Sequence, residues 1–111
     1  MAFKTYDKGG VTVLELQGRI TLGGTDVKMR DLIKAQLEAG KKKMVLDLGG
    51  VSFIDSSGLG ELVAAYTTAR RQNVTLKLAN LTKKIDDLME ITRLASVFDT
   101  YQSVDEAVKS F

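Results

Sequence analysis

Residues 51–62 of this 111-residue chain have the sequence Val51-Ser52-Phe53-Ile54-Asp55-Ser56-Ser57-Gly58-Leu59-Gly60-Glu61-Leu62. From Leu59 onward, apolar side chains recur at the spacing i, i+3, i+4 and i+7, which is typical of one face of a helix. Asp and Ser are residues that cap helix N-termini. The stretch therefore predicts a helix that begins at the turn 55–58 and runs to about Arg71.

The segment upstream of this turn predicts a buried parallel strand. Residues 44–48, Met-Val-Leu-Asp-Leu, form a short and largely apolar run that ends at Gly49-Gly50, as is typical of a strand covered on both faces. Before it, helical spacing begins at Thr25 or Asp26, either of which can cap the helix, and ends at Gly40. A helix between two such strands implies a parallel crossover.

An antiparallel hairpin is predicted ahead of that helix. Residues 2–7 and 11–17 are rich in residues that favour strands, and Lys8-Gly9-Gly10 between them contains glycines that can adopt positive φ. Gly18 ends the second of these strands in this interpretation. The hairpin is the one antiparallel part of the predicted sheet.

Downstream of the second helix, three further elements and one short strand are predicted. Val74, Leu76 and Leu78 alternate with polar residues, which predicts a strand. Thr82 opens a third helix, a short strand is expected around Val97-Phe98, and the Ser-x-x-Glu spacing of a capping box at 103–106 opens a last helix through Phe111.

The predicted fold is a single α/β domain over residues 1–111. We expect a mixed, mainly parallel sheet of four to five strands, with an N-terminal antiparallel hairpin and about four helices packed against it.

The composition excludes several classes of function. The chain contains no Cys, so it has no disulfide, thiolate nucleophile or cysteine metal site, and no His, the usual general base and commonest transition-metal ligand. Its net charge is only +2, from 16 basic and 14 acidic residues, which gives no strong attraction to nucleic acid. No stretch approaches the roughly 20 apolar residues of a membrane span or the apolar run of a secretion signal. We expect a cytoplasmic protein with no nucleic-acid partner and no membrane insertion.

The serines of the turn do not match a known catalytic pattern. A Gly-x-Ser-x-Gly elbow requires Gly two residues before the nucleophile, and Ile54 occupies that place before Ser56. Without His no Ser-His-Asp triad can form, and only a Ser–Lys pair stays open. Gly58-Leu59-Gly60 is half of a dinucleotide-binding fingerprint, because Val63 stands where the third Gly belongs. We therefore expect neither catalysis nor a bound cofactor.

The acidic residues do not have the spacing of a metal site. Without His or Cys only a hard cation could bind, and no calcium-loop spacing is present. Asp86, Asp87 and Glu90 are instead expected on the solvated face of the third helix.

The turn 55–58 holds more small polar residues than capping requires. One residue of this kind suffices to cap a helix. The others leave an exposed hydroxyl at the positive end of the helix dipole, where a kinase can reach it and where weak anion affinity is physically reasonable. The two following glycines, Gly58 and Gly60, are expected to permit a tight start of the helix and close backbone packing.

Residues 51–62 closely resemble the signature of the anti-sigma factor antagonists of the STAS domain family, and Asp-Ser-Ser-Gly-Leu-Gly at 55–60 is its most specific part. The order of the other elements agrees: a hairpin ending in Gly18, a strand at 45–48, and a distal helix ahead of Val97-Phe98. The resemblance covers essentially the whole chain. It implies the fold predicted above and a non-enzymatic, protein-binding switch.

Members of this family are bound by an anti-sigma factor that is also a serine kinase, which frees a sigma factor, and phosphorylation of the first Ser of the motif ends the binding. The resemblance implies that Ser56 accepts the phosphate, with Ser57 as the second candidate. It also implies a partner-binding surface made of Thr21, Asp55, Ser56, Ser57, Gly58, Leu59 and Gly60. The ATP and magnesium belong to the kinase, a phosphatase is a further expected partner, and the free chain is expected to be a monomer.

One position departs from the family pattern. Members commonly carry an acid in a Gly-x-Leu-Asp segment after the second strand, whereas this chain has Gly18-Arg19-Ile20-Thr21, so that Thr21 replaces the acid. A second hypothesis therefore stays open: a STAS module that binds constitutively within a larger signalling or transport assembly and is never phosphorylated. A third, a small enzyme that uses Ser56, is disfavoured by the lack of His.

Overall fold

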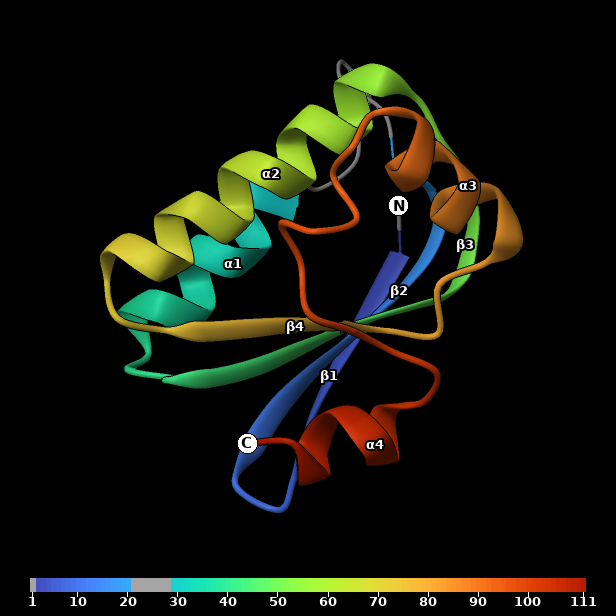
Figure 1. The fold of residues 1–111 in the computed structure, drawn as a ribbon. Helices are drawn as coiled ribbons and strands as arrows, with labels where there is room; N and C mark the ends of the chain where they lie inside the picture. The colour runs from blue at the N-terminus through green and yellow to red at the C-terminus, as the bar shows by residue number, and fades with distance from the viewer. Residues whose placement is uncertain (1, 21–28) are drawn as a thin grey trace.

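The sheet is built around the long strand that leads into the turn 55–58. In a computed structural model, which describes residues 2–20 and 29–111, five strands lie side by side in chain order (Figure 1). The first pair is antiparallel and the other three pairs are parallel. The strands are β1 (Ala2–Lys8), β2 (Val11–Ile20), β3 (Lys43–Ile54), β4 (Thr75–Ala79) and β5 (Thr100–Tyr101). The predicted mixed, mainly parallel sheet is confirmed.

Helices cover both faces of this sheet. Figure 1 shows the longer helices on one face and a short helix, near the C-terminus, on the other. The larger group is α1 (Met29–Glu38), α2 (Ser56–Arg71) and α3 (Lys83–Ile91), and the last helix is α4 (Val104–Lys109). The number of helices among the described residues agrees with the prediction.

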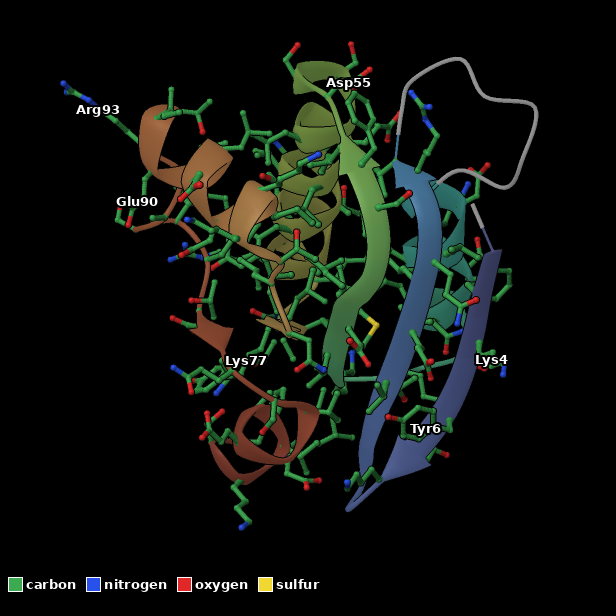
Figure 2. All side chains as sticks on the ribbon, turned by 90° about the vertical axis from the view of Figure 1, so that its right-hand side faces the viewer. Lys4, Tyr6, Asp55, Lys77, Glu90 and Arg93 are labelled. Carbon is green, nitrogen blue, oxygen red and sulfur yellow. The ribbon has the colours of Figure 1, made fainter. Side chains whose placement is uncertain are left out.

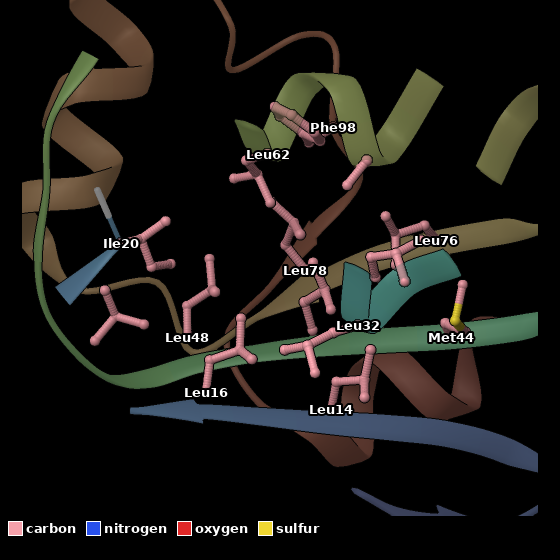
Figure 3. Packing of buried hydrophobic residues seen from close by; sticks show 14 of the residues in the cluster. Leu14, Leu16, Ile20, Leu32, Met44, Leu48, Leu62, Leu76, Leu78 and Phe98 are labelled. Carbon is pink, nitrogen blue, oxygen red and sulfur yellow. The ribbon is translucent and has the colours of Figure 1, made fainter. Parts of the chain in front are cut away.

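Alternating side chains of the central strands separate into two cores. Leu14 and Leu46 belong to the larger core, between the sheet and helices α1 to α3 (Figure 3). Their neighbours Val13 and Val45 face the other way and pack with α4. All four side chains are fully buried, so the prediction that the strand at 44–48 is covered on both faces is confirmed.

Two strands are longer than predicted, because glycine does not end them. β2 continues past Gly18, and β3 continues past Gly49-Gly50 to Ile54. The parallel ladder crosses this region with shifts of register, and it pairs Gln17 with Gly50. A Cβ on Gly50 would lie 2.8 Å from the Gln17 Cγ atom. Gly50 thus permits the two strands to approach each other rather than making a turn.

The short strand predicted around Val97-Phe98 is present, but it begins two residues after Phe98. β5 lies at Thr100–Tyr101, and Phe98 belongs to a turn. Its ring packs edge-to-face on Tyr66 of α2, with 5.0 Å between the ring centroids. Phe98 fills the core from a loop. Its apolar side chain therefore does not indicate a strand at this position.

The helix caps agree with the sequence where the structure describes them. The Thr82 side chain accepts from the Ile85 amide, and the Ser103 side chain accepts from the Glu106 amide. Helix α4 ends at Lys109, two residues earlier than predicted. The predicted caps Thr25 and Asp26 lie outside the described residues.

Candidate functional site

The turn that joins β3 to α2 lies at the edge of the sheet where the parallel strands end. Asp55 has an extended backbone there, with φ −99° and ψ −179°, and its Oδ1 atom accepts a hydrogen bond of 2.7 Å from the Gly58 amide. Figure 2 shows Asp55 where β3 meets α2. Asp55 is therefore the N-cap of α2, which confirms that one polar residue of the turn caps the helix.

Because the Asp55 side chain caps α2, the hydroxyls of Ser56 and Ser57 are not needed for capping. Both residues are exposed and are the first two of α2. Within the described part of the chain, neither hydroxyl makes a hydrogen bond. The first turn of α2 adds no acidic residue to the Asp55 carboxylate, which is the described negative charge at the positive end of the helix dipole. The site presents free hydroxyls at a position that favours added negative charge.

Gly58 is the point at which β2 touches α2. A Cβ built on Gly58 would lie 2.0 Å from the carbonyl oxygen of Ile20 and 2.7 Å from its carbonyl carbon. Those atoms are backbone, so no side chain fits without a shift of the end of β2. The contact holds Ile20 beside the motif, while Thr21, the next residue, lies outside the described residues.

Leu59 and Gly60 contribute differently from Gly58. Leu59 is 3% exposed and its side chain belongs to the larger core. Gly60 is exposed, and no described atom lies within 4 Å of where its Cβ would be. The close packing predicted for both glycines is thus confirmed for Gly58 and wrong for Gly60. Of the predicted partner-binding residues, Ser56, Ser57 and Gly60 present exposed surface.

A shallow groove beside the turn was not predicted from the sequence. It has a volume of about 180 Å³, and its walls are residues 52–54 of β3 on one side and residues of α3 and its cap on the other: Thr82, Lys84, Ile85 and Leu88. The β3 wall ends two residues before Ser56. The walls are about thirty positions apart along the chain, so no local periodicity could reveal them. One sign is present in the sequence: two lysines open α3, where the helix dipole disfavours cations.

The titratable groups whose pKa values are shifted lie away from this turn. Burial raises the pKa of Tyr6 above its ordinary value, and the carboxylates of Asp47 and Glu15 raise it further. A hydrogen bond from Lys8 lowers the pKa of Asp105, and the same bond raises the pKa of Lys8.

Two further features are absent among the described residues. No group of three or more Asp or Glu side chains is arranged to hold a metal ion, and no described helix combines the length and hydropathy needed to cross a membrane. Asp86, Asp87 and Glu90 are exposed on α3, as the sequence predicted.

Comparison with known proteins identifies the family of this chain. Residues 2–107 match the family model of the STAS domain. The chain belongs to the STAS domain family. The anti-sigma-B factor antagonist of Listeria monocytogenes is 32% identical over 81 residues, which cover 69% of this STAS chain and 71% of that protein. BtrV of Bordetella bronchiseptica, a proposed anti-sigma factor antagonist, is 28% identical over 108 residues, covering 96% and 92% of the two chains.

Solved structures of similar fold carry related names. An anti-sigma factor antagonist from Mycobacterium paratuberculosis superposes with a TM-score of 0.84 at 23% identity, over 98% of the STAS chain and 92% of that chain. The Bacillus cell-fate determinant SpoIIAA in its phosphorylated form has a TM-score of 0.70 at 18% identity, with 98% of each chain covered. At these identities the likeness establishes the fold alone.

Proposed function

We propose that this STAS domain is an anti-sigma factor antagonist that acts as a non-enzymatic binding switch. It binds an anti-sigma factor with serine kinase activity while Ser56 is unmodified, and it dissociates once that kinase has phosphorylated Ser56. A phosphatase resets the switch. The observation that carries the proposal is the exposed Ser56 hydroxyl, without a hydrogen-bond partner in the described part of the chain, at the first position of a helix already capped by Asp55.

The helix dipole favours a phosphate at this position, while the neighbouring Asp55 carboxylate opposes it. A phosphoserine carries roughly −1.5 to −2 charges at neutral pH. At a helix N-terminus, each unit of negative charge is favoured by about 0.3–1 kcal/mol. The Ser56 hydroxyl makes no hydrogen bond within the described residues that the modification would break. Phosphorylation should therefore leave the fold intact.

The same charge opposes a closed interface. A partner seated over Ser56 would have to bury the phosphate, and an unpaired buried charge costs about 3–5 kcal/mol. Because 1.4 kcal/mol corresponds to a factor of about ten in affinity, this penalty weakens binding by more than about a hundredfold. The switch would act on the interface and not on the stability of the domain.

The test is phosphorylation of the purified chain by the anti-sigma-type serine kinases of its own cell, with ATP and magnesium, followed by mass spectrometry of the intact chain and its peptides. We expect one phosphate, absent from Ser56→Ala and retained by Ser57→Ala. The serine variants are matched, since both residues are exposed and neighbouring. A phosphate that persists in Ser56→Ala would contradict the assignment. No phosphate with any of these kinases would favour the constitutively binding STAS module.

A further inference from the structure

The groove between β3 and α3, defined above by its lining residues, is apolar at its base and partly open at its walls. Ile54 and Ile85 are buried and contribute to both the core and the groove. Phe53 forms a wall and stays 39% exposed. A large aromatic side chain that lines a concave surface and remains in contact with water is typical of a contact surface for another molecule.

Arg19 of β2 fixes one side of that wall. Its guanidinium carbon lies 4.6 Å from the centroid of the Phe53 ring, within the range of a cation–π contact. The pairing of Arg19 with Phe53 in the β2–β3 ladder places the two residues side by side on the sheet. The aromatic wall is therefore held in place by the fold.

The charge at the opposite wall is unusual for its position. Lys83 and Lys84 are the first two residues of α3, where the helix dipole disfavours positive charge. Within the described part of the chain, neither lysine makes an ion pair, not even with Asp86 in the same turn. Of the two lysines, Lys84 lines the groove, whereas Lys83 is not among its lining residues. The Lys84 ammonium group is thus available to pair with a carboxylate of a bound partner.

The groove lies close along the chain to the proposed phosphorylation site. Its β3 wall is formed by residues 52–54, and only Asp55 separates that wall from Ser56. A partner that covers Ser56 and the end of β3 would contact the wall formed by residues 52–54.

We propose that the groove is part of the binding surface for the anti-sigma partner: it receives an apolar side chain of that partner, while an adjacent Asp or Glu of the partner pairs with Lys84. This inference rests on the proposed function and names the chemistry of the partner segment.

The experiment measures the affinity of the unphosphorylated chain, by calorimetry, for the kinase that phosphorylates the wild-type chain. Lys84→Glu should weaken binding by about tenfold or more, and Phe53→Ala should do the same, as is usual for central contacts. Lys83→Glu is the matched control: it makes the same charge change one residue away, outside the groove lining, and should alter affinity by less than about threefold.

Folding is controlled independently in the same variants. Lys84→Glu replaces a cation by an anion at the positive end of α3, so its thermal unfolding midpoint should not fall. An exchange of the contacting acid on the kinase for Lys should restore binding to Lys84→Glu.

The outcomes separate the two proposals. Wild-type affinity in both Lys84→Glu and Phe53→Ala, together with lost binding in Ser56→Asp, would overturn the groove proposal and leave the proposed function standing. An equal loss in Lys83→Glu and Lys84→Glu would show a general charge effect and would also overturn the groove proposal. Undiminished binding of Ser56→Asp would overturn the proposed function, while the groove variants still decide the role of the groove.

Discussion

Gly58 and Gly60 are two residues apart in the same helix, but the structure gives them opposite roles. Gly58 packs directly against the backbone of Ile20, so hydrogen is the only side chain that fits. Gly60 faces open space among the described residues, where a glycine only weakens the helix. The packing of the motif therefore requires glycine at position 58, whereas nothing among the described residues requires glycine at position 60.

The two glycines make a matched pair of substitutions. Gly58→Ala should destabilise the chain by about 1–3 kcal/mol, because its Cβ forces the end of β2 away from α2. Gly60→Ala should stabilise it by about 0.5–1 kcal/mol, since alanine is the better helix former. Chemical denaturation of both variants checks the prediction. A loss of stability in Gly60→Ala equal to that in Gly58→Ala would contradict this account of the motif.

At the scale of elements, α4 is attached to the sheet by a buried lysine. Lys77 of β4 is 7% exposed, and Figure 2 places it beside α4. Its Nζ atom donates to the Ser110 carbonyl oxygen at 3.0 Å and to the Ser110 Oγ atom at 2.6 Å. The same atom lies 4.5 Å from the centroid of the Phe111 ring and 5.3 Å from that of Tyr101. The charge is thus held by hydroxyl and carbonyl oxygens and by aromatic faces.

Removal of this attachment should loosen α4 before the rest of the chain. Lys77→Ala should cost about 1.5–3 kcal/mol, the range for hydrogen bonds to a charged group, and should speed amide hydrogen exchange within 104–109 more than within α2. Lys109→Ala, an exposed lysine on α4 itself, is the control and should change stability by less than about 0.5 kcal/mol. Uniformly faster exchange throughout the chain would argue against a local role for Lys77.

At the scale of the whole molecule, sequence periodicity predicted the type and order of the elements but not how they meet. The boundaries at Gly18 and Gly49-Gly50 were wrong because both strands continue past these glycines, and at Gly50 the missing side chain permits a close approach between β2 and β3. Phe98 was assigned to a strand because an apolar residue that fills the core from a loop cannot be distinguished in the sequence from one in a strand. The groove beside Ser56 was not predictable, since its walls belong to elements that only the tertiary fold brings together.

An ion pair joins the two ends of the described chain and should make stability depend on pH. Lys8 of β1 donates to the Asp105 carboxylate of α4, which lowers the pKa of Asp105. A carboxyl with a lowered folded-state pKa adds stability that is complete above its unfolded value, about 3.9, and is lost as the pH falls through the lower folded value. Asp105→Asn should therefore be less stable than wild type at pH 7.

The expected difference is small and sensitive to salt, because both side chains are exposed. Denaturation of wild type and Asp105→Asn should show the two stabilities converging as the pH falls below about 4. A gap that stays constant down to the lowest accessible pH would exclude this ion pair as its source.

The central claim, that phosphate on Ser56 acts on the interface and not on the fold, is tested most directly by one paired measurement. The affinities of the unphosphorylated and the Ser56-phosphorylated chain for the kinase are measured by calorimetry, with the unfolding free energy of each form determined alongside. We predict an affinity lower by more than about a hundredfold on phosphorylation, with an unfolding free energy changed by no more than about 1–2 kcal/mol. Equal affinities, or a phosphorylated chain that has lost most of its stability, would contradict the account.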